Sequence, residues 1–317
     1  MHSVIPRIIS LCLLTLCLVG ISPAVIAKGD LSTKEARKII AGMSGFALKT
    51  SAVRVNSVRV VDAATVEASA EIATAFRFEK NQAGQWRVAE FRSGQDQWQS
   101  VDVVTRALKI EPNMGACDAA GLAVDASKIS EPNNKRARCL LAELLGIQLP
   151  SDSVRIKAIS PLSLPLTSKS SAMIEALVDA DFRFNRGPKG SWRVAGVRTG
   201  SRAWVDPEIV LSALNSEKAA GARADLEEIA RALEGFRGQR GSYVESKSQR
   251  VLIDFLSPRY LSRVIRLDPW RRPYLYEGTR DHFTLRSLGP DGKENTPDDI
   301  VLSKPAGSTA QFKAISQ

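Results

Sequence analysis

Two stretches of the chain repeat one another. Residues 76–98 read FRFEKNQAGQWRVAEFRSGQDQW, and residues 182–204 read FRFNRGPKGSWRVAGVRTGSRAW. Four of the five tryptophans fall at equivalent places in this comparison. The match continues on both sides of the two stretches, with a short insertion near residues 160–170 of the second copy. The sequence therefore predicts an internal duplication in the larger, N-terminal part of the chain.

Each copy carries the same succession of predicted elements. A helix comes first, because apolar residues recur at helical spacing in residues 34–43 and 136–145. Strands follow, and in residues 65–72 apolar and polar side chains alternate as they do in a strand with one buried face. A hairpin loop with glycine precedes each WRV sequence. A short helix is expected to end each copy, at 101–108 and at 207–214. A helix on an antiparallel sheet gives the α+β class.

At the level of fold only, each copy resembles the cystatin-like and NTF2-like domains, in which a curved sheet wraps a helix or a pocket. We therefore expect two tandem repeat domains and a separate C-terminal domain. The predicted boundaries are a signal peptide at 1–27, repeat domain 1 at 28–110, a linker at 111–135, repeat domain 2 at 136–215 and the C-terminal domain at 216–317.

Six arginines beside the tryptophans are candidates for contact with an acidic ligand. An arginine row that alternates with aromatic rings could bind an acidic peptide or glycan through cation–π contacts. The alternative is a solvated outer face on a sheet whose tryptophans lie in the core, and the alternation favours this interpretation. The six are Arg77, Arg87, Arg92, Arg183, Arg193 and Arg198.

The composition of this chain of 317 residues is that of a globular protein. It is 44% hydrophobic and 25% charged, which excludes a disordered, collagen-like or multi-span membrane chain. The net charge of +10 favours acidic partners or anionic surfaces. It is too small to indicate nucleic-acid binding by itself, so no nucleic-acid partner is expected.

The N-terminus has the pattern of a secretory signal peptide. One basic residue, Arg7, precedes an apolar run from Ile8 to Ile21, and Ala27 is a small residue at the expected cleavage site. An uncleaved anchor helix is the alternative. The run is short for a membrane span of about 20 residues, and Pro23 interrupts it. We expect a periplasmic or secreted protein with no stable membrane span after cleavage.

Cleavage would leave two cysteines, Cys117 in the linker and Cys139 in the first helix of the second copy. Two cysteines in an oxidising compartment usually pair, so we predict a disulfide between them. A free buried thiol is the alternative. Cysteine and histidine ligands are too few for a zinc site.

No sequence motif in the chain indicates catalysis. Phosphate-binding glycine loops, a nucleophile elbow and a zinc-protease helix are all absent from the sequence. After cleavage the one remaining histidine is His282, which we expect at the surface beside a strand. The sequence therefore predicts a protein that is not an enzyme.

The last hundred residues carry several motifs in a fixed order. An amphipathic helix is expected from Ser216 to Phe236, because its apolar residues recur at spacings of three and four. The sequence GSY at 241–243 follows, and then DPWRRPYLY at 268–276. The loop SLGPDG begins at Ser287, and the sequence DDI closes it at residues 298–300.

This order of motifs resembles the C-terminal globular domain of the major pseudopilin of the type II secretion system, over about 219–302. In that family the final loop binds Ca²⁺. The resemblance implies a calcium site made by the side chains of Asp291, Asp298 and Asp299 with the main-chain oxygens of Leu288 and Thr296. Carboxylates and carbonyls are the hard oxygen ligands that Ca²⁺ prefers.

Members of that family begin with a short leader and a long apolar helix that packs the filament, and this chain shows neither. It places two repeats before the globular domain, so the resemblance leaves filament assembly and prepilin-peptidase processing open. We predict a non-enzymatic binding or adaptor component linked to the secretion machinery, with a protein partner in the cell envelope. The alternative is a periplasmic ligand-binding protein that holds a peptide, glycan or small molecule on its curved sheets.

Overall fold

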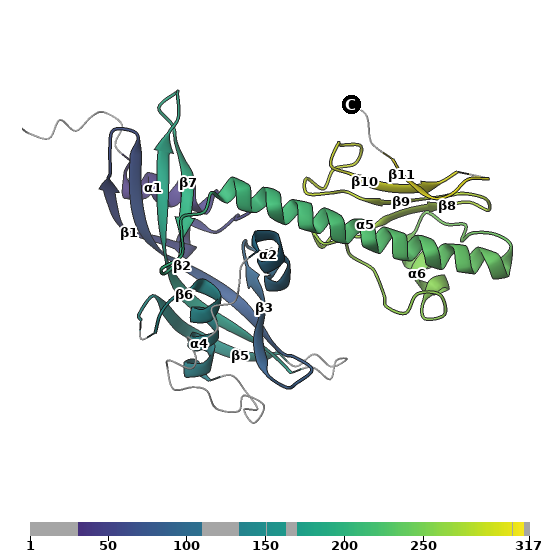
Figure 1. Ribbon diagram of the computed structural model, residues 1–317, viewed down its shortest axis with the longest axis horizontal. Helices are drawn as coiled ribbons and strands as arrows, with labels where there is room; N and C mark the ends of the chain where they lie inside the picture. The colour runs from purple at the N-terminus through teal and green to yellow at the C-terminus, as the bar shows by residue number, and fades with distance from the viewer. Residues whose placement is uncertain (1–30, 110–132, 150, 163–169, 306, 314–317) are drawn as a thin grey trace, which may run out of the picture.

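The computed structural model describes residues 31–109, 133–149, 151–162, 170–305 and 307–313. Figure 1 shows two α+β parts connected by one long helix. The expected signal peptide and most of the expected linker, with Cys117, lie outside the described residues.

The first copy contains two helices, a short 3₁₀ turn and four strands. Ser32 caps the first helix, because its hydroxyl accepts a hydrogen bond of 3.1 Å from the amide of Glu35. Two long strands with a glycine turn between them form the hairpin that the alternation predicts. The elements are α1 (Thr33–Ala41), the turn Thr50–Ala52, β1 (Val53–Val60), β2 (Thr65–Lys80), β3 (Trp86–Arg92), β4 (Trp98–Ser100) and α2 (Val101–Leu108).

The second copy repeats this order up to its last strand. Asn133 caps the first helix by accepting from the amide of Arg136 at 2.9 Å. Gly146 ends this helix at a positive φ of 67°, a conformation that favours glycine. The elements are α4 (Asn134–Leu145), β5 (Val154–Leu162), β6 (Ser171–Arg186) and β7 (Trp192–Arg198).

The two copies share a single seven-stranded sheet. Strands β2 and β6 pair antiparallel along nearly their whole lengths and form its centre. β1 and β3 follow one another along the outer edge of β2, and β5 and β7 do the same along β6. The expectation of two separate repeat domains is therefore corrected: the strands of one copy complete the sheet of the other.

The register of the central strands relates the copies by a twofold axis. Ile72 pairs with Val178, and these residues occupy equivalent positions in the two repeats, as Phe76 and Phe182 do. An antiparallel pair in which equivalent residues face each other has the geometry of a C₂ interface. The axis of the duplication therefore passes between Ile72 and Val178.

Each hydrophobic core of this sheet combines elements of both copies. Helix α1 of the first copy packs with β1 and the first half of β2, but also with the second half of β6 and with β7. Helix α4 of the second copy packs with β5 and the first half of β6, together with β3 of the first copy. In Figure 1, α1 and α4 accordingly lie over opposite ends of the sheet. Neither copy encloses a core of its own.

One helix, α5 (Pro207–Arg240), joins the sheet to the C-terminal part. The sequence predicted two helices, one ending at residue 214 and another starting at 216. The one residue between them, Asn215, does not break a helix, so the two segments continue as one. Asp206 caps it by accepting from the amide of Glu208 at 2.8 Å, and Gly241 ends it at φ 77°. The expected domain boundary at 215/216 falls inside this helix.

The C-terminal part packs a small antiparallel sheet and a short helix against the second half of α5. Its core includes Leu226, Ile229 and Leu233 from α5, with Tyr274 and Phe283 from the following segments. The strand order is β11-β10-β9-β8. The elements are α6 (Gln249–Leu256), β8 (Leu275–Gly278), β9 (Phe283–Ser287), β10 (Ile300–Lys304) and β11 (Gln311–Lys313).

Four polar contacts hold the junction of the two parts: the first connects the C-terminal part to α5, and the other three connect the C-terminal part or α5 to the sheet part. Trp270 donates to Asn215 at 3.1 Å, and Arg271 forms an ion pair with Glu90 of β3. Arg106 of α2 pairs with Glu217 at 2.6 Å. The fourth contact is the hydrogen bond of 2.6 Å from the buried Lys218 ammonium to the amide oxygen of Gln99.

Candidate functional site

The segment between β9 and β10 is held in place by hydrogen bonds from Arg272 and by contacts between its own two ends. Arg272 donates to the carbonyls of Gly289 and, at 3.1 Å, of Pro290. Gly289 has a φ of 59°, and a Cβ there would lie 2.3 Å from the carbonyl oxygen of Asp298. Only glycine fits this close approach of the two ends of the loop.

Asp291 and Asp298 meet through main-chain and side-chain contacts. The amide of Asp291 donates to Oδ2 of Asp298 at 3.0 Å. Burial works against the charged form of Asp298, but this hydrogen bond and the one from the Thr296 hydroxyl hold its pKa below the usual value. The carboxylate of Asp291 accepts from the amide of Lys293 at 2.8 Å. Hydrogen bonds to main-chain amides of the loop therefore hold both carboxylates in place.

Asp299 is the buried member of the three. Its side chain is 0% exposed, and its Oδ2 atom accepts from Arg286 at 3.3 Å and from the amide of Asn295 at 2.9 Å. Its Oδ1 atom is buried and has no hydrogen-bond partner among the described residues. Burial raises the pKa of this carboxyl. An unpartnered buried carboxylate oxygen is costly, and a cation would relieve that cost.

The residues of the loop fit a calcium ion only when main-chain oxygens are included. Within the described ranges, no group of three or more acidic, histidine or cysteine side chains lies close enough to hold a metal. The expected carbonyl ligands each accept one hydrogen bond, Leu288 from Gly292 and Thr296 from Asp299, both at 3.1 Å. A carbonyl oxygen has two lone pairs, so each keeps one for a cation. This donor set of carboxylates and carbonyls is the kind that Ca²⁺ uses.

Four of the six candidate arginines are neutralised by carboxylates, three of them on strands of the sheet and one on α2. Arg77 pairs with Glu90, Arg87 with Asp102, Arg183 with Glu67, and Arg198 with Asp181. No such ion pair is seen for Arg92 or Arg193 within the described residues. A row of free positive charge along the sheet is therefore not present, because most of its members already have acidic partners.

The same cation–π contacts recur in both copies. Arg77 lies 5.0 Å from the centre of the Trp98 ring, and its counterpart Arg183 lies 4.4 Å from that of Trp204. Lys80 lies 5.5 Å from the ring of Trp86, and the equivalent pair Arg186 and Trp192 is at 5.7 Å. The cations therefore stack on tryptophans of their own copy, and the repeated contacts support the duplication.

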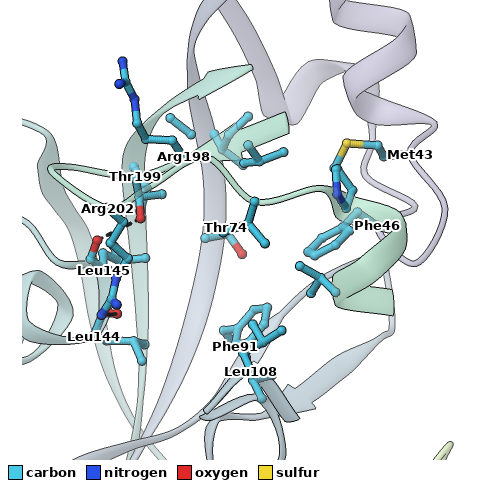
Figure 2. A pocket seen from close by; sticks show the side chains of 18 of the residues that line it. Met43, Phe46, Thr74, Phe91, Leu108, Leu144, Leu145, Arg198, Thr199 and Arg202 are labelled. Carbon is cyan, nitrogen blue, oxygen red and sulfur yellow. Dashed lines mark hydrogen bonds between the residues drawn. The ribbon is translucent and has the colours of Figure 1, made fainter. Parts of the chain in front are cut away.

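An apolar cavity of about 320 Å³ lies at the axis between the two copies. Ile72 and Val178, the paired residues of the axis, both line it, and so do residues from the ends of α1, α2 and α4 and from the start of α5. Figure 2 shows Phe46, Thr74, Phe91 and Leu108 around this space. The sequence did not predict a cavity here, because its walls come from both copies and depend on the pairing of β2 with β6.

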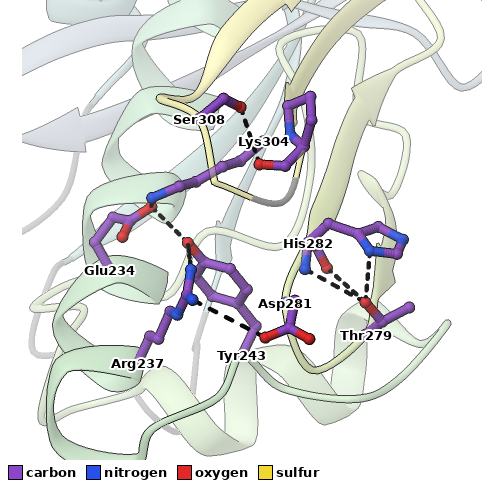
Figure 3. A network of polar contacts seen from close by, with 9 residues as sticks. Glu234, Arg237, Tyr243, Thr279, Asp281, His282, Lys304 and Ser308 are labelled. Atoms are coloured by element: carbon purple, nitrogen blue, oxygen red, sulfur yellow. Dashed lines mark hydrogen bonds and ion pairs between the residues drawn. The ribbon is translucent and has the colours of Figure 1, made fainter.

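The one histidine among the described residues belongs to a turn. His282 is exposed, and its Nδ1 atom lies 2.8 Å from the hydroxyl of Thr279. Figure 3 shows it beside a polar network that ties α5 to the small sheet. In that network Tyr243 donates to Glu234 at 2.9 Å, and Lys304 donates to the same carboxylate at 2.6 Å. The contacts are those of a structural network.

Cys139 is buried in α4. Its expected partner Cys117 lies outside the described residues, so the disulfide stays a prediction. Among the helices that the structure describes, none is both long and apolar enough to cross a membrane.

Comparison with known families identifies the C-terminal region. Residues 209–303 match the family described as type II secretion system (T2SS), protein G. The matched region runs from the first turn of α5 into β10, and so begins earlier than the sequence motifs indicated. No curated protein and no solved structure matches the chain. The resemblance of this region to the pseudopilin family is confirmed, and it links the chain to the secretion machinery.

Proposed function

We propose that this protein is a non-enzymatic component of the periplasm that binds to the type II secretion machinery through its C-terminal domain. The observation that carries the proposal is the family match over residues 209–303. The structure adds that the helix of this domain begins at the sheet of the repeats. The pseudopilin-like domain would thus attach the protein to the machinery, and the two repeats would be its cargo-binding part.

The proposal is tested by co-purification with the secretion apparatus. The full chain, tagged at its C-terminus, is expected to enrich the pseudopilins of its own cell from a detergent-solubilised envelope. A chain truncated after Asp206 serves as the control, since it lacks the matched region. Equal amounts of pseudopilin with both proteins, measured by quantitative mass spectrometry, would contradict the proposal.

We also propose that Ca²⁺ stabilises the C-terminal domain. The side chains of Asp291, Asp298 and Asp299 and the carbonyls of Leu288 and Thr296 would hold it. When bound, the ion would neutralise these carboxylates. The support is the donor set of the loop together with the unpartnered Oδ1 atom of Asp299. A ligand at 100 times its Kd stabilises the folded state by about 2.7 kcal/mol.

The calcium proposal is tested by thermal unfolding of the full chain with calcium or with a chelator. Calcium is expected to raise the Tm of the transition that unfolds the C-terminal domain, and Asp291→Ala should remove most of that rise. Glu294→Ala is the matched control, because it removes a carboxylate of the same loop that is not among the expected ligands. Identical melting curves for the unsubstituted chain under both conditions would exclude a calcium site.

The cavity favours a second function, that of a periplasmic ligand-binding protein. A cavity of this size is at the lower end of the range for small-molecule sites. The two functions are compatible, because the cavity shares only the start of α5, at Val210, with the matched region. Binding by this cavity is tested by the experiment that closes the next subsection.

A further inference from the structure

The chemistry of the cavity wall restricts what it can hold. Apart from three threonines and three arginines, every described residue that lines the cavity is apolar. Each lining threonine donates its hydroxyl proton within the protein: Thr74 to the carbonyl of Arg92 at 2.7 Å, Thr105 to that of Val101 at 3.0 Å, and Thr199 to that of Leu145 at 2.8 Å. The wall therefore has no free hydroxyl donor for a polar ligand.

A wall of this kind disfavours peptides and glycans. A peptide backbone or a sugar would lose its hydrogen bonds to water without replacement, and each buried polar group without a partner costs free energy. An alkyl chain loses no hydrogen bond and gains from the burial of its apolar surface. Of the ligand classes that the sequence left open, the cavity fits a small molecule with an apolar chain.

Two arginines at the wall, Arg92 and Arg202, have no ion pair with a carboxylate among the described residues. Arg202 donates to the carbonyl of Leu144 at 2.9 Å, and it has no ion pair within the described part of the chain. Figure 2 shows it beside Leu144 and Leu145, whereas the guanidinium of Arg198 points away from the cavity and pairs with Asp181 at 2.8 Å. Arg92 occupies the position equivalent to Arg198 in the other copy.

Among the residues that the structure describes, no acidic side chain lines the cavity. An anion at its edge would therefore meet the positive charge of Arg202 and no opposing carboxylate of the wall. Arginine suits a carboxylate because its planar guanidinium donates two parallel hydrogen bonds. With one N–H group on the Leu144 carbonyl, Arg202 keeps others for such a ligand.

We propose that the cavity binds a single-chain carboxylate amphiphile, a fatty acid, with its alkyl chain between the two copies and its head group on Arg202. This proposal rests on the ligand-binding function proposed above and names its ligand class. The cavity volume of about 320 Å³ admits one alkyl chain rather than a lipid with two.

The proposal is tested by calorimetric titration of the purified full chain with dodecanoate and with dodecan-1-ol, both below the concentrations at which they aggregate. The acid is expected to bind roughly tenfold more tightly than the alcohol, since a charge-assisted hydrogen bond is lost with the carboxylate. Equal affinities would overturn the head-group assignment and leave an apolar binding site. Binding of neither compound would overturn the ligand-binding function as well.

Substitutions then place the ligand in the cavity. Arg202→Gln should abolish the preference for the acid, while Arg202→Lys should retain most of it. Arg193→Gln, at an exposed arginine outside the cavity, is the control for charge. Val104→Trp should weaken binding of both compounds by at least about tenfold, because it fills the cavity from α2.

The control for bulk is Val103→Trp, the same change at a neighbour on α2 that does not line the cavity. Val210→Trp, from the start of α5, replaces Val104→Trp if that variant does not fold. Undiminished binding in a folded cavity-filling variant would show that the ligand binds elsewhere and would overturn the proposal.

Discussion

Ile72 and Val178 lie directly opposite each other in the central strand pair, and each is the counterpart of the other in the duplicated sequence. The copies are therefore arranged as the two subunits of a C₂ dimer would be, within one chain. The hydrophobic cores on either side of the axis contain strands from both copies. Stability of either half thus depends on the presence of the other.

Separated halves of the chain are expected to need each other to fold. When residues 28–110 and 133–317 are co-expressed as two chains, they should co-purify as a one-to-one complex, because each supplies strands to the other's core. The first fragment alone should not be a folded monomer. Size-exclusion chromatography with light scattering and circular dichroism would measure this. A cooperatively folding monomer of 28–110 would contradict the exchanged cores.

Two phenylalanines at equivalent positions of the copies allow the exchange of strands to be tested in each core separately. Phe78 and Phe184 are both 0% exposed, and replacing either by alanine should cost roughly 3–5 kcal/mol. Phe184 belongs to the second copy but packs in the core with α1. Its loss should therefore reduce hydrogen-exchange protection in α1, while Phe78→Ala should do so in α4.

If each copy folded independently, Phe184→Ala would instead reduce protection in α4, and Phe78→Ala would reduce it in α1. Phe312→Ala serves as the control, since this side chain is 39% exposed on β11 and should change stability by less than about 0.5 kcal/mol.

An acid-sensitive contact joins the copies at Glu67. Arg183 of the second copy donates to it at 2.8 Å, and this hydrogen bond, together with that from Arg59, holds the pKa of Glu67 below the usual value. A lowered carboxyl pKa contributes stability above the unfolded value of 4.5, and that contribution is lost as the pH falls through the folded pKa.

Glu67→Gln should therefore lower stability by about 1 kcal/mol at pH 7, and the difference from the unsubstituted chain should shrink as the pH falls below 4.5. Urea unfolding at a series of pH values measures it. The exposed Glu175 of β6 provides the control substitution Glu175→Gln. A difference that stayed constant down to pH 3 would show that the charge of Glu67 is not involved.

The buried Lys218 carries a charge at the junction between α5 and the sheet. Burial lowers its pKa from the usual 10.5, so the charged form is disfavoured in the folded state. Stability should rise with pH between the folded pKa and 10.5, because the unfolded chain binds more protons there. Lys218→Met should stabilise the protein by about 1 kcal/mol at pH 7.

That gain should diminish towards pH 10 as the lysine of the unsubstituted chain loses its proton. Thermal unfolding at both pH values measures it. If Lys218→Met destabilised the protein at pH 7, the hydrogen bond to Gln99 would outweigh the cost of burying the charge.

Local patterns in the sequence were sufficient for several features of the fold. The repeated FRF and WRV sequences predicted the duplication and the long hairpins, because alternation along a strand depends only on which face is buried. The ordered motifs from Gly241 to Ile300 indicated the C-terminal family. The three aspartates lie in one loop, but their side chains do not gather into a metal-binding group among the described residues, and the unpartnered oxygen of Asp299 became visible only in the folded chain.

Non-local features were decided by the tertiary structure. Nothing in the alternation of residues 65–80 or 171–186 says that these two strands pair with each other, since either could have been an edge strand of a separate sheet. Because β2 pairs with β6 at Ile72 and Val178, each hydrophobic core contains strands of both copies, and the cavity forms between the copies. The sequence by itself thus determined the repeats, the element types and the C-terminal family, which depend on neighbouring residues. The shared sheet and the cavity depend on contacts between distant residues, and only the folded chain makes them.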